Sequence, residues 1–184
     1  MLLKRIFDII FSIVLIILLF PIIIIGYVLA SVDVRNNGFF FQKRIGQYGK
    51  HFTIYKLQTI HPKTKQISKI GAFLRKTKID ELPQLFNILK GDMSFVGPRP
   101  DIPGYYDLLE GENHKILNLK PGITSEASIK YANEEYLLKE MPDPFEYNDK
   151  VLFPDKVKMN LEYYYKRSFW LDVKIILKTV FSRF

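Results

Sequence analysis

The chain has 184 residues, a net charge of +8 at pH 7, a sequence pI near 9.5 and no cysteine. The absence of cysteine excludes a disulfide-stapled secreted scaffold and fits a reducing compartment. About 150 residues remain outside a long apolar run at the N-terminus, which suits one modest domain better than two.

The first element along the chain is an uncharged run of twenty-four residues from Ile9 to Val32. As a straight helix it would reach ~36 Å, longer than the ~30 Å hydrocarbon core of a bilayer. Basic residues flank the run on both sides, and the positive-inside rule would keep both ends cytoplasmic. Pro21 favours a kink near the middle. We therefore predict a re-entrant helix over residues 1–36, with a single-pass anchor and a cleaved signal peptide as the alternatives.

The next segment, from Gly38 to Thr59, contains two β-prone runs on either side of a loop rich in glycine, which predicts a β-hairpin. Two short helices follow. Ser68 begins the first, and the second has Asp80 as a candidate N-cap and Gly91 at its end. The region from Asp92 to Pro103, rich in proline and glycine, predicts an ordered loop.

The C-terminal part begins with a helical pattern from Gly104 to about Leu119 and a turn over residues 120–122. The tail from Asn160 to Phe184 predicts an amphipathic helix, which packs on the core or contacts a membrane. The predicted fold class is α+β: a small, mostly helical monotopic membrane domain with a re-entrant helix-break-helix, a short β-hairpin and a C-terminal amphipathic helix. The membrane helix takes residues 1–36, and a cytosolic domain at the membrane interface takes residues 37–184.

Charge is distributed very unevenly along the chain. Between Val34 and Ile79 there are eleven basic side chains and no acid, and the acid-free stretch ends in the adjacent carboxylates Asp80 and Glu81. Such a field attracts polyanions. A nucleic-acid ligand is disfavoured by the apolar run, and the absence of any Asp-x-Asp disfavours a glycosyltransferase that binds its metal through that motif.

The two carboxylates are also what an ordinary capped helix would carry, so the capped helix is the structural alternative. In the functional interpretation, Asp80 is a nucleophile that attacks phosphorus and Glu81 is a ligand of Mg²⁺. Mg²⁺ typically uses one or two carboxylates plus substrate phosphates. Arg75 could reach the same pocket or remain a solvated surface residue. Arg99, framed by two prolines, is rigid enough to grip a phosphate, or it marks a structural turn.

Several motifs carry a resemblance to a known family: KRIFDIIFS near the start, LRKTKIDELPQLFNILKGDMSFVGPRP in the middle, then KPGIT and SFWLDVKIILKT. Together they cover nearly the whole chain, which resembles the bacterial sugar transferase family of small monotopic phosphoglycosyl transferases. Two departures from the usual pattern concern nucleotide contacts: Gln58 stands in place of a basic residue, and the loop from His61 to Ser68 is shorter and more basic.

The resemblance implies transfer of a phospho-sugar from a nucleotide sugar, usually a UDP-sugar, to polyprenol phosphate with release of UMP, as the first membrane step of surface glycan assembly. It implies that Asp80 forms a covalent phospho-sugar intermediate and that Glu81 binds Mg²⁺. The substrate-binding residues carried over are Lys56, Arg75, Pro98 and Arg99.

The expected partners are a UDP-sugar, polyprenol phosphate and membrane lipid, without nucleic acid, and a homodimer is a candidate assembly. The expected location is the cytoplasmic face of the bacterial inner membrane. The alternative is a non-catalytic peripheral protein that docks anionic lipid through its basic stretch. That reading explains the charge and the anchor, but it leaves GDMSFVGPRP and the carboxylate pair without a function.

Overall fold

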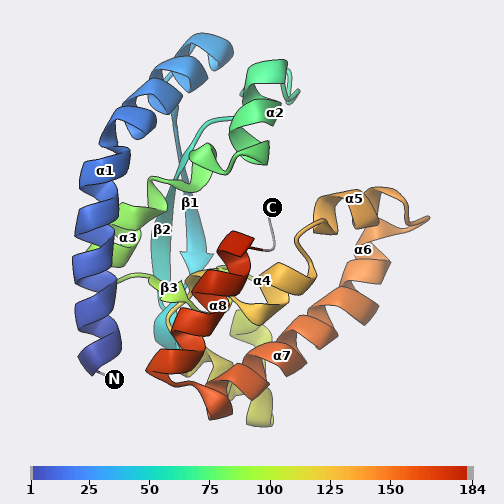
Figure 1. Cartoon of the computed structure of the whole chain (residues 1–184). Coiled ribbons are helices and arrows are strands. Elements are labelled where there is room, and N and C mark those ends of the chain that lie inside the picture. The colour runs from blue at the N-terminus through green and yellow to red at the C-terminus, as the bar shows by residue number, and fades with distance from the viewer. Residues whose placement is uncertain (1, 182–184) are drawn as a thin grey trace. The chain divides into compact units, whose positions relative to one another are not determined.

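A computed structural model describes residues 2–181, which form two compact units. Of the described residues, the first unit comprises 2–44 and 51–93, and the second comprises 45–50 and 94–181. Figure 1 shows the elements of both units. The mixture of many helices with a few short strands confirms the predicted α+β class. The predicted boundary between a membrane helix up to residue 36 and the rest of the chain stays a prediction.

The long helix α1 (Leu2–Val34) dominates the first unit and is the one described helix that is long and apolar enough to cross a membrane. It continues through Pro21 as one helix and bends along its length (Figure 1), so the predicted break is a bend and not an interruption. Its buried positions form a stripe that includes small side chains, at Asp8, Ser12, Ile23, Gly26, Ala30 and Val34.

The remaining faces of α1 expose large apolar side chains. Ile17 and Leu18 are 68% and 66% exposed. A soluble protein rarely leaves such a continuous apolar surface in water, so this helix suits lipid.

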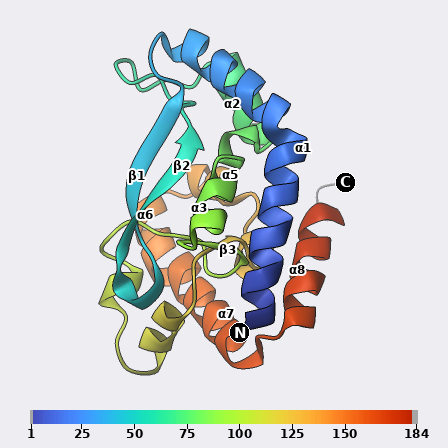
Figure 2. The same cartoon turned by 90° about the vertical axis from the view of Figure 1, so that its left-hand side faces the viewer.

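The predicted hairpin is confirmed as β1 (Phe39–Ile45) and β2 (His51–Leu57), joined through a short turn η1 (Gln47–Gly49) that belongs to the second unit. The helices α2 (Lys69–Lys76) and α3 (Gln84–Lys90) follow, separated by the 3₁₀ turn η2 (Ile79–Glu81). As predicted, Ser68 caps α2, because its Oγ accepts a hydrogen bond from the Gly71 N–H at 2.9 Å. Figure 2 shows α3 between the hairpin and α1.

The core of the first unit is small and lies where α1, β2 and α2 meet. Ala30, Leu57 and Leu74 are buried there, and Tyr27, Phe39 and Ile79 pack around them. The apolar helix therefore contributes directly to the core beneath η2.

The second unit contains a parallel pair of strands, β3 (Ser94–Val96) and β4 (Gly122–Thr124), in the register Ser94 to Gly122 and Val96 to Thr124. Both strands fall in segments predicted as a loop and a turn. The segment expected to be helical up to residue 119 forms two 3₁₀ helices, η3 (Tyr106–Leu108) and η4 (Gly111–Asn118).

Helices α4 (Glu126–Lys130), α5 (Glu134–Lys139) and α6 (Pro144–Tyr147), the π-helical η5 (Asn148–Leu152), α7 (Phe153–Lys166) and α8 (Phe169–Phe181) complete the second unit. The predicted tail helix is thus two helices, and its last three positions lie outside the described residues. Ile175 of α8 is fully buried, whereas Trp170 and Phe181 are 77% and 72% exposed. α8 therefore packs on its unit and also presents apolar side chains to the surroundings.

Candidate active site

The carboxylates Asp80 and Glu81 lie in the 3₁₀ turn η2 between α2 and α3. The turn follows Lys78, whose backbone is left-handed (φ 59°), and it is closed by a hydrogen bond from the Glu81 N–H to the Lys78 carbonyl at 3.1 Å. The alternative in which Asp80 caps a helix is wrong, because α3 begins at Gln84 and its N-cap, Pro83, makes no side-chain hydrogen bond.

Asp80 is buried, with 8% of its surface exposed, and its Oδ1 atom has no hydrogen-bond partner. Burial raises the pKa of this carboxyl, and the neighbouring Glu81 charge raises it further. The positive charges of Lys56, Lys78 and Arg75 act in the opposite direction. A buried polar atom left unsatisfied destabilises a fold, and such atoms are concentrated where a ligand completes the site.

Glu81 is paired with Lys56 of β2, whose Nζ atom lies 3.1 Å from Glu81 Oε1. Both side chains are largely buried, with 18% of Lys56 and 11% of Glu81 exposed. Solvent therefore screens this pair less than it screens a surface ion pair. The structure thus brings together four of the predicted site residues from three elements: Asp80 and Glu81 on η2, Lys56 on β2 and Arg75 on the last turn of α2.

The donor set fits a Mg²⁺ ion shared with a phosphorylated substrate. Within residues 2–181, no group of three or more His, Asp or Glu side chains is arranged to hold a metal alone. Mg²⁺ does not require such a cage, because one or two carboxylates suffice when phosphate oxygens and water complete the octahedron. The Glu81 carboxylate would be the protein ligand in such a partial site, and the unsatisfied Asp80 Oδ1 lies on the neighbouring residue of the same turn.

Close packing against α1 positions the turn that carries the carboxylates. A Cβ atom at Gly26 would lie 2.8 Å from both Ile79 Cγ2 and Leu57 Cδ1, too close for an ordinary contact. An alanine at this position would force the side chains of Ile79, the residue before Asp80, and Leu57 to shift. The apolar helix is therefore part of the scaffold of the site.

Two residues that the sequence analysis did not assign to the site hold α3 in place. Asn87 is fully buried and accepts a hydrogen bond from the Tyr55 N–H at 3.0 Å, while its Nδ2 donates to the Thr53 carbonyl at 2.7 Å. Arg5 of α1 donates to the carbonyls of Ile88 and Leu89 at 2.7 and 2.9 Å.

A signal for Asn87 was present in the sequence, because an amide on the apolar face of a short helix must find buried partners. Arg5 gave no such signal. It looks the same in sequence as any basic residue that flanks an apolar run.

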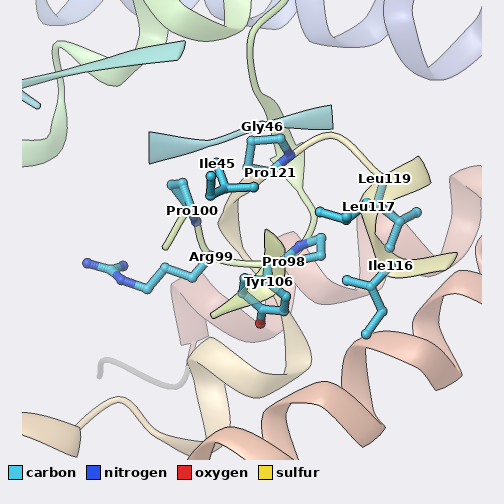
Figure 3. Close-up of a pocket in the computed structure, with 10 residues that line it drawn as sticks. All are labelled: Ile45, Gly46, Pro98, Arg99, Pro100, Tyr106, Ile116, Leu117, Leu119 and Pro121. Atoms are coloured by element: carbon cyan, nitrogen blue, oxygen red, sulfur yellow. The ribbon is translucent and has the colours of Figure 1, made fainter. Parts of the chain in front are cut away.

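The predicted substrate-binding residues Pro98 and Arg99 belong to the second unit. They line a small pocket whose other walls are mainly apolar, with Arg99 as the one charged lining residue. Figure 3 shows the Arg99 guanidinium extending away from the apolar cluster.

Two glycines set the backbone that leads into this proline-framed arginine. A Cβ at Gly97 would lie 2.1 Å from the Lys120 carbonyl oxygen, and one at Gly122 would lie 2.1 Å from the Gly97 nitrogen. The VGPRP and KPGIT segments therefore run in direct backbone contact, fixed by hydrogen bonds such as Gly122 N–H to the Pro98 carbonyl at 2.8 Å. This frame holds the backbone of Arg99 rigidly.

Comparison with known proteins identifies the family. The family model described as "Bacterial sugar transferase" matches residues 1–184. The uncharacterised sugar transferase EpsL of Bacillus subtilis (strain 168) is 34% identical over 98% of this chain and 86% of its own length.

Two relatives with assigned activities are longer proteins. The UDP-glucose:undecaprenyl-phosphate glucose-1-phosphate transferase of Klebsiella pneumoniae is 36% identical over all of this chain and 40% of its own length. The UDP-N-acetylgalactosamine-undecaprenyl-phosphate N-acetylgalactosaminephosphotransferase of Aeromonas hydrophila is 29% identical over 96% of this chain and 42% of its own length. The chain spans about two fifths of these two relatives, and the match covers it from end to end: it is an enzyme of the bacterial sugar transferase family.

Proposed function

We propose that this enzyme transfers a phospho-sugar from a UDP-sugar to polyprenol phosphate, giving a polyprenyl-diphospho-sugar and UMP. The observation that carries the proposal is the buried, unsatisfied oxygen of Asp80 beside Glu81, surrounded by the positive charges of Lys56, Arg75 and Lys78. Relatives named for undecaprenyl phosphate and UDP-sugars support the choice of both substrates.

In the first half-reaction, a carboxylate oxygen of Asp80 attacks the phosphorus proximal to the sugar. The bond from that phosphorus to the bridging oxygen breaks, and UMP leaves with the electron pair. The product is an acyl phosphate that joins Asp80 to the phospho-sugar. The positive charges around the turn stabilise the approach of a dianionic donor to a carboxylate, because they offset the repulsion between them.

In the second half-reaction, an oxygen of polyprenol phosphate attacks the same phosphorus and releases the Asp80 carboxylate. The attacking phosphate is already anionic, so no general base is needed. Glu81, with the substrate phosphates, would hold Mg²⁺, which supplies charge neutralisation at the phosphate oxygens. Arg75, Lys56, Pro98 and Arg99 are proposed as substrate-binding residues.

The exposed apolar surface of α1 supports a location in the bacterial inner membrane, and both of its flanks carry basic residues. We place the catalytic residues at the cytoplasmic face, where UDP-sugars are made. A re-entrant α1 with both ends on that face is part of this proposal.

The alternative, a non-catalytic protein that docks on lipid, conflicts with membership of a transferase family. UMP release from a UDP-sugar in the presence of undecaprenyl phosphate and Mg²⁺ distinguishes the two directly. Asp80→Asn should lower turnover by at least ~1,000-fold. Glu146→Gln, which removes an exposed carboxylate on α6, should leave it unchanged. Undiminished turnover in Asp80→Asn would refute the assignment.

A further inference from the structure

Helix α2 and the loop that precedes it combine exposed apolar side chains with exposed lysines, outside the candidate active site. We call this patch the headgroup surface and define it by Lys63, Ile67, Lys69, Ile70, Phe73 and Lys76. Ile67, Ile70 and Phe73 are 41%, 36% and 54% exposed. These are large fractions for residues that lie within eight positions of one another, on α2 and the loop that precedes it.

The order of residues on α2 is that of an interfacial helix. Lys69, Phe73 and Lys76 are spaced at i, i+4 and i+7, so they share one face, while Gly71 and Leu74 are buried on the other side. Lysines on both sides of a phenylalanine can extend their charged ends upward to phosphates while the ring and the lysine stems lie in apolar surroundings.

The headgroup surface adjoins the end of the apolar helix. Ser68 Oγ donates a hydrogen bond to Asp33 Oδ2 at 2.6 Å, which ties the start of α2 to the last turn of α1. Val32, one residue earlier on α1, is 68% exposed. Figure 1 shows α2 beside this end of α1. Where the lipid-facing side of α1 ends, the exposed side chains of α2 therefore begin.

Charge identifies the kind of surface that this patch fits. Its lysines lie in the stretch from Val34 to Ile79 that contains no acid, so their field is not neutralised locally in sequence. On the second unit, by contrast, Lys139 and Lys150 are each paired with a glutamate four residues earlier. A basic and apolar patch next to a membrane helix matches an anionic phospholipid surface, where each lysine strengthens binding about fivefold.

We propose that the headgroup surface binds anionic phospholipid headgroups and forms a second membrane contact of the first unit. The inference rests on the membrane anchoring in the proposed function. It adds a dependence on lipid charge that the anchor alone does not require. Its residues are separate from those assigned to the reaction.

The test uses the full chain in lipid nanodiscs, with a fluorophore at Ala72→Cys, which is a unique label site because the chain has no cysteine. Quenching by nitroxides on the lipid chains measures the depth of the label. We expect strong quenching in discs that contain phosphatidylglycerol and weak quenching in discs of phosphatidylcholine alone. Lys63→Gln/Lys69→Gln/Lys76→Gln should weaken docking by on the order of 100-fold and abolish the lipid dependence.

The matched control is Lys139→Gln/Lys150→Gln/Lys166→Gln, which removes the same charge from lysines already paired with glutamates, and it should retain the dependence. Phe73→Ser should reduce quenching in both kinds of disc. A label that stays accessible to aqueous iodide in phosphatidylglycerol discs, or a first triple variant that behaves like the control, would overturn the inference.

Two further outcomes are diagnostic. Burial of the label by added UDP in phosphatidylcholine discs, together with no added quenching in phosphatidylglycerol discs, would make the patch a nucleotide subsite and would refute lipid docking. A protein that fails to elute with the discs would instead contradict the anchoring on which the inference rests.

Discussion

Replacement of Arg5 tests what this residue does in α1. It is either a flanking charge of that apolar helix or a support for α3, the helix that follows the turn η2 with Asp80 and Glu81. Its guanidinium donates to the carbonyls of Ile88 and Leu89 in the last turn of α3, at 2.7 and 2.9 Å. The Ile88 carbonyl also accepts a hydrogen bond from the Gly91 N–H at 3.0 Å, and a positive charge at a helix C-terminus is favourable in itself. Arg5→Met removes both contacts.

The loss of stability expected in Arg5→Met follows from these two hydrogen bonds. Two hydrogen bonds to a charged group at the lower end of the usual range would contribute about 3 kcal/mol together. Because both bonds are only partly buried and water can replace part of each, Arg5→Met should destabilise α3 by about 2 to 3 kcal/mol. Arg5→Lys keeps the charge and at most one of the two bonds, so about half of that loss is expected.

Hydrogen–deuterium exchange of the segment 84–93 measures this local stability in detergent micelles or nanodiscs. The amides of Gly91, Asp92 and Met93 all donate to the Asn87 carbonyl, so they report the integrity of the end of α3. Their exchange should accelerate by about 30- to 150-fold in Arg5→Met. Lys4→Met, which removes the same charge one residue earlier, is the control. Equal acceleration in the two variants would refute a specific contact and leave Arg5 as a flanking charge.

Two other predictions concern the turn η2 that carries Asp80 and Glu81. Burial raises the pKa of Asp80 above its ordinary value of 3.8, so the ionised carboxyl destabilises the fold at pH values above its folded pKa, and stability returns as the pH falls toward the unfolded value. Asp80→Asn should therefore raise the melting temperature in metal-free buffer at pH 7.5, with a gain that shrinks toward pH 4; a gain independent of pH would contradict the electrostatic cause. Gly26→Ala places a Cβ 2.8 Å from Ile79 Cγ2 and Leu57 Cδ1, so it should lower the free energy of unfolding by about 1 to 3 kcal/mol. It should also lower kcat for UMP release. Ile25→Ala, on the exposed side of α1, should leave kcat unchanged, and an unaltered kcat in Gly26→Ala would refute the supporting contact.

The elements that could be predicted from sequence are those whose signals are local. The apolar run, the hairpin, the Ser68 cap and the Gly91 end of α3 depend on hydrophobic period, turn residues and caps within a few positions. The carboxylate pair could also be recognised from sequence, because it ends the acid-free basic stretch and lies within the LRKTKIDELPQLFNILKGDMSFVGPRP motif.

The elements that sequence reasoning missed depend on contacts between distant segments. Strands β3 and β4 have three residues each and exist because Gly97 and Gly122 allow two backbones to touch, which no local pattern reveals. The 3₁₀ turn at Asp80 arises from a left-handed Lys78, a conformation that the helical pattern on both sides conceals. Arg5 acts across more than eighty residues of sequence.

The central claim is that Asp80 carries the phospho-sugar during turnover. Incubation of the purified enzyme with a UDP-sugar and Mg²⁺, without polyprenol phosphate, followed by rapid acid quench and peptide mass spectrometry, tests it most directly. We expect a peptide containing Asp80 that gains the mass of one phospho-sugar and loses it when undecaprenyl phosphate is added. The same peptide should never gain this mass in Asp80→Asn. Full turnover with an adduct on another residue, or with none at any time point, would rule out Asp80 as the carrier of the phospho-sugar.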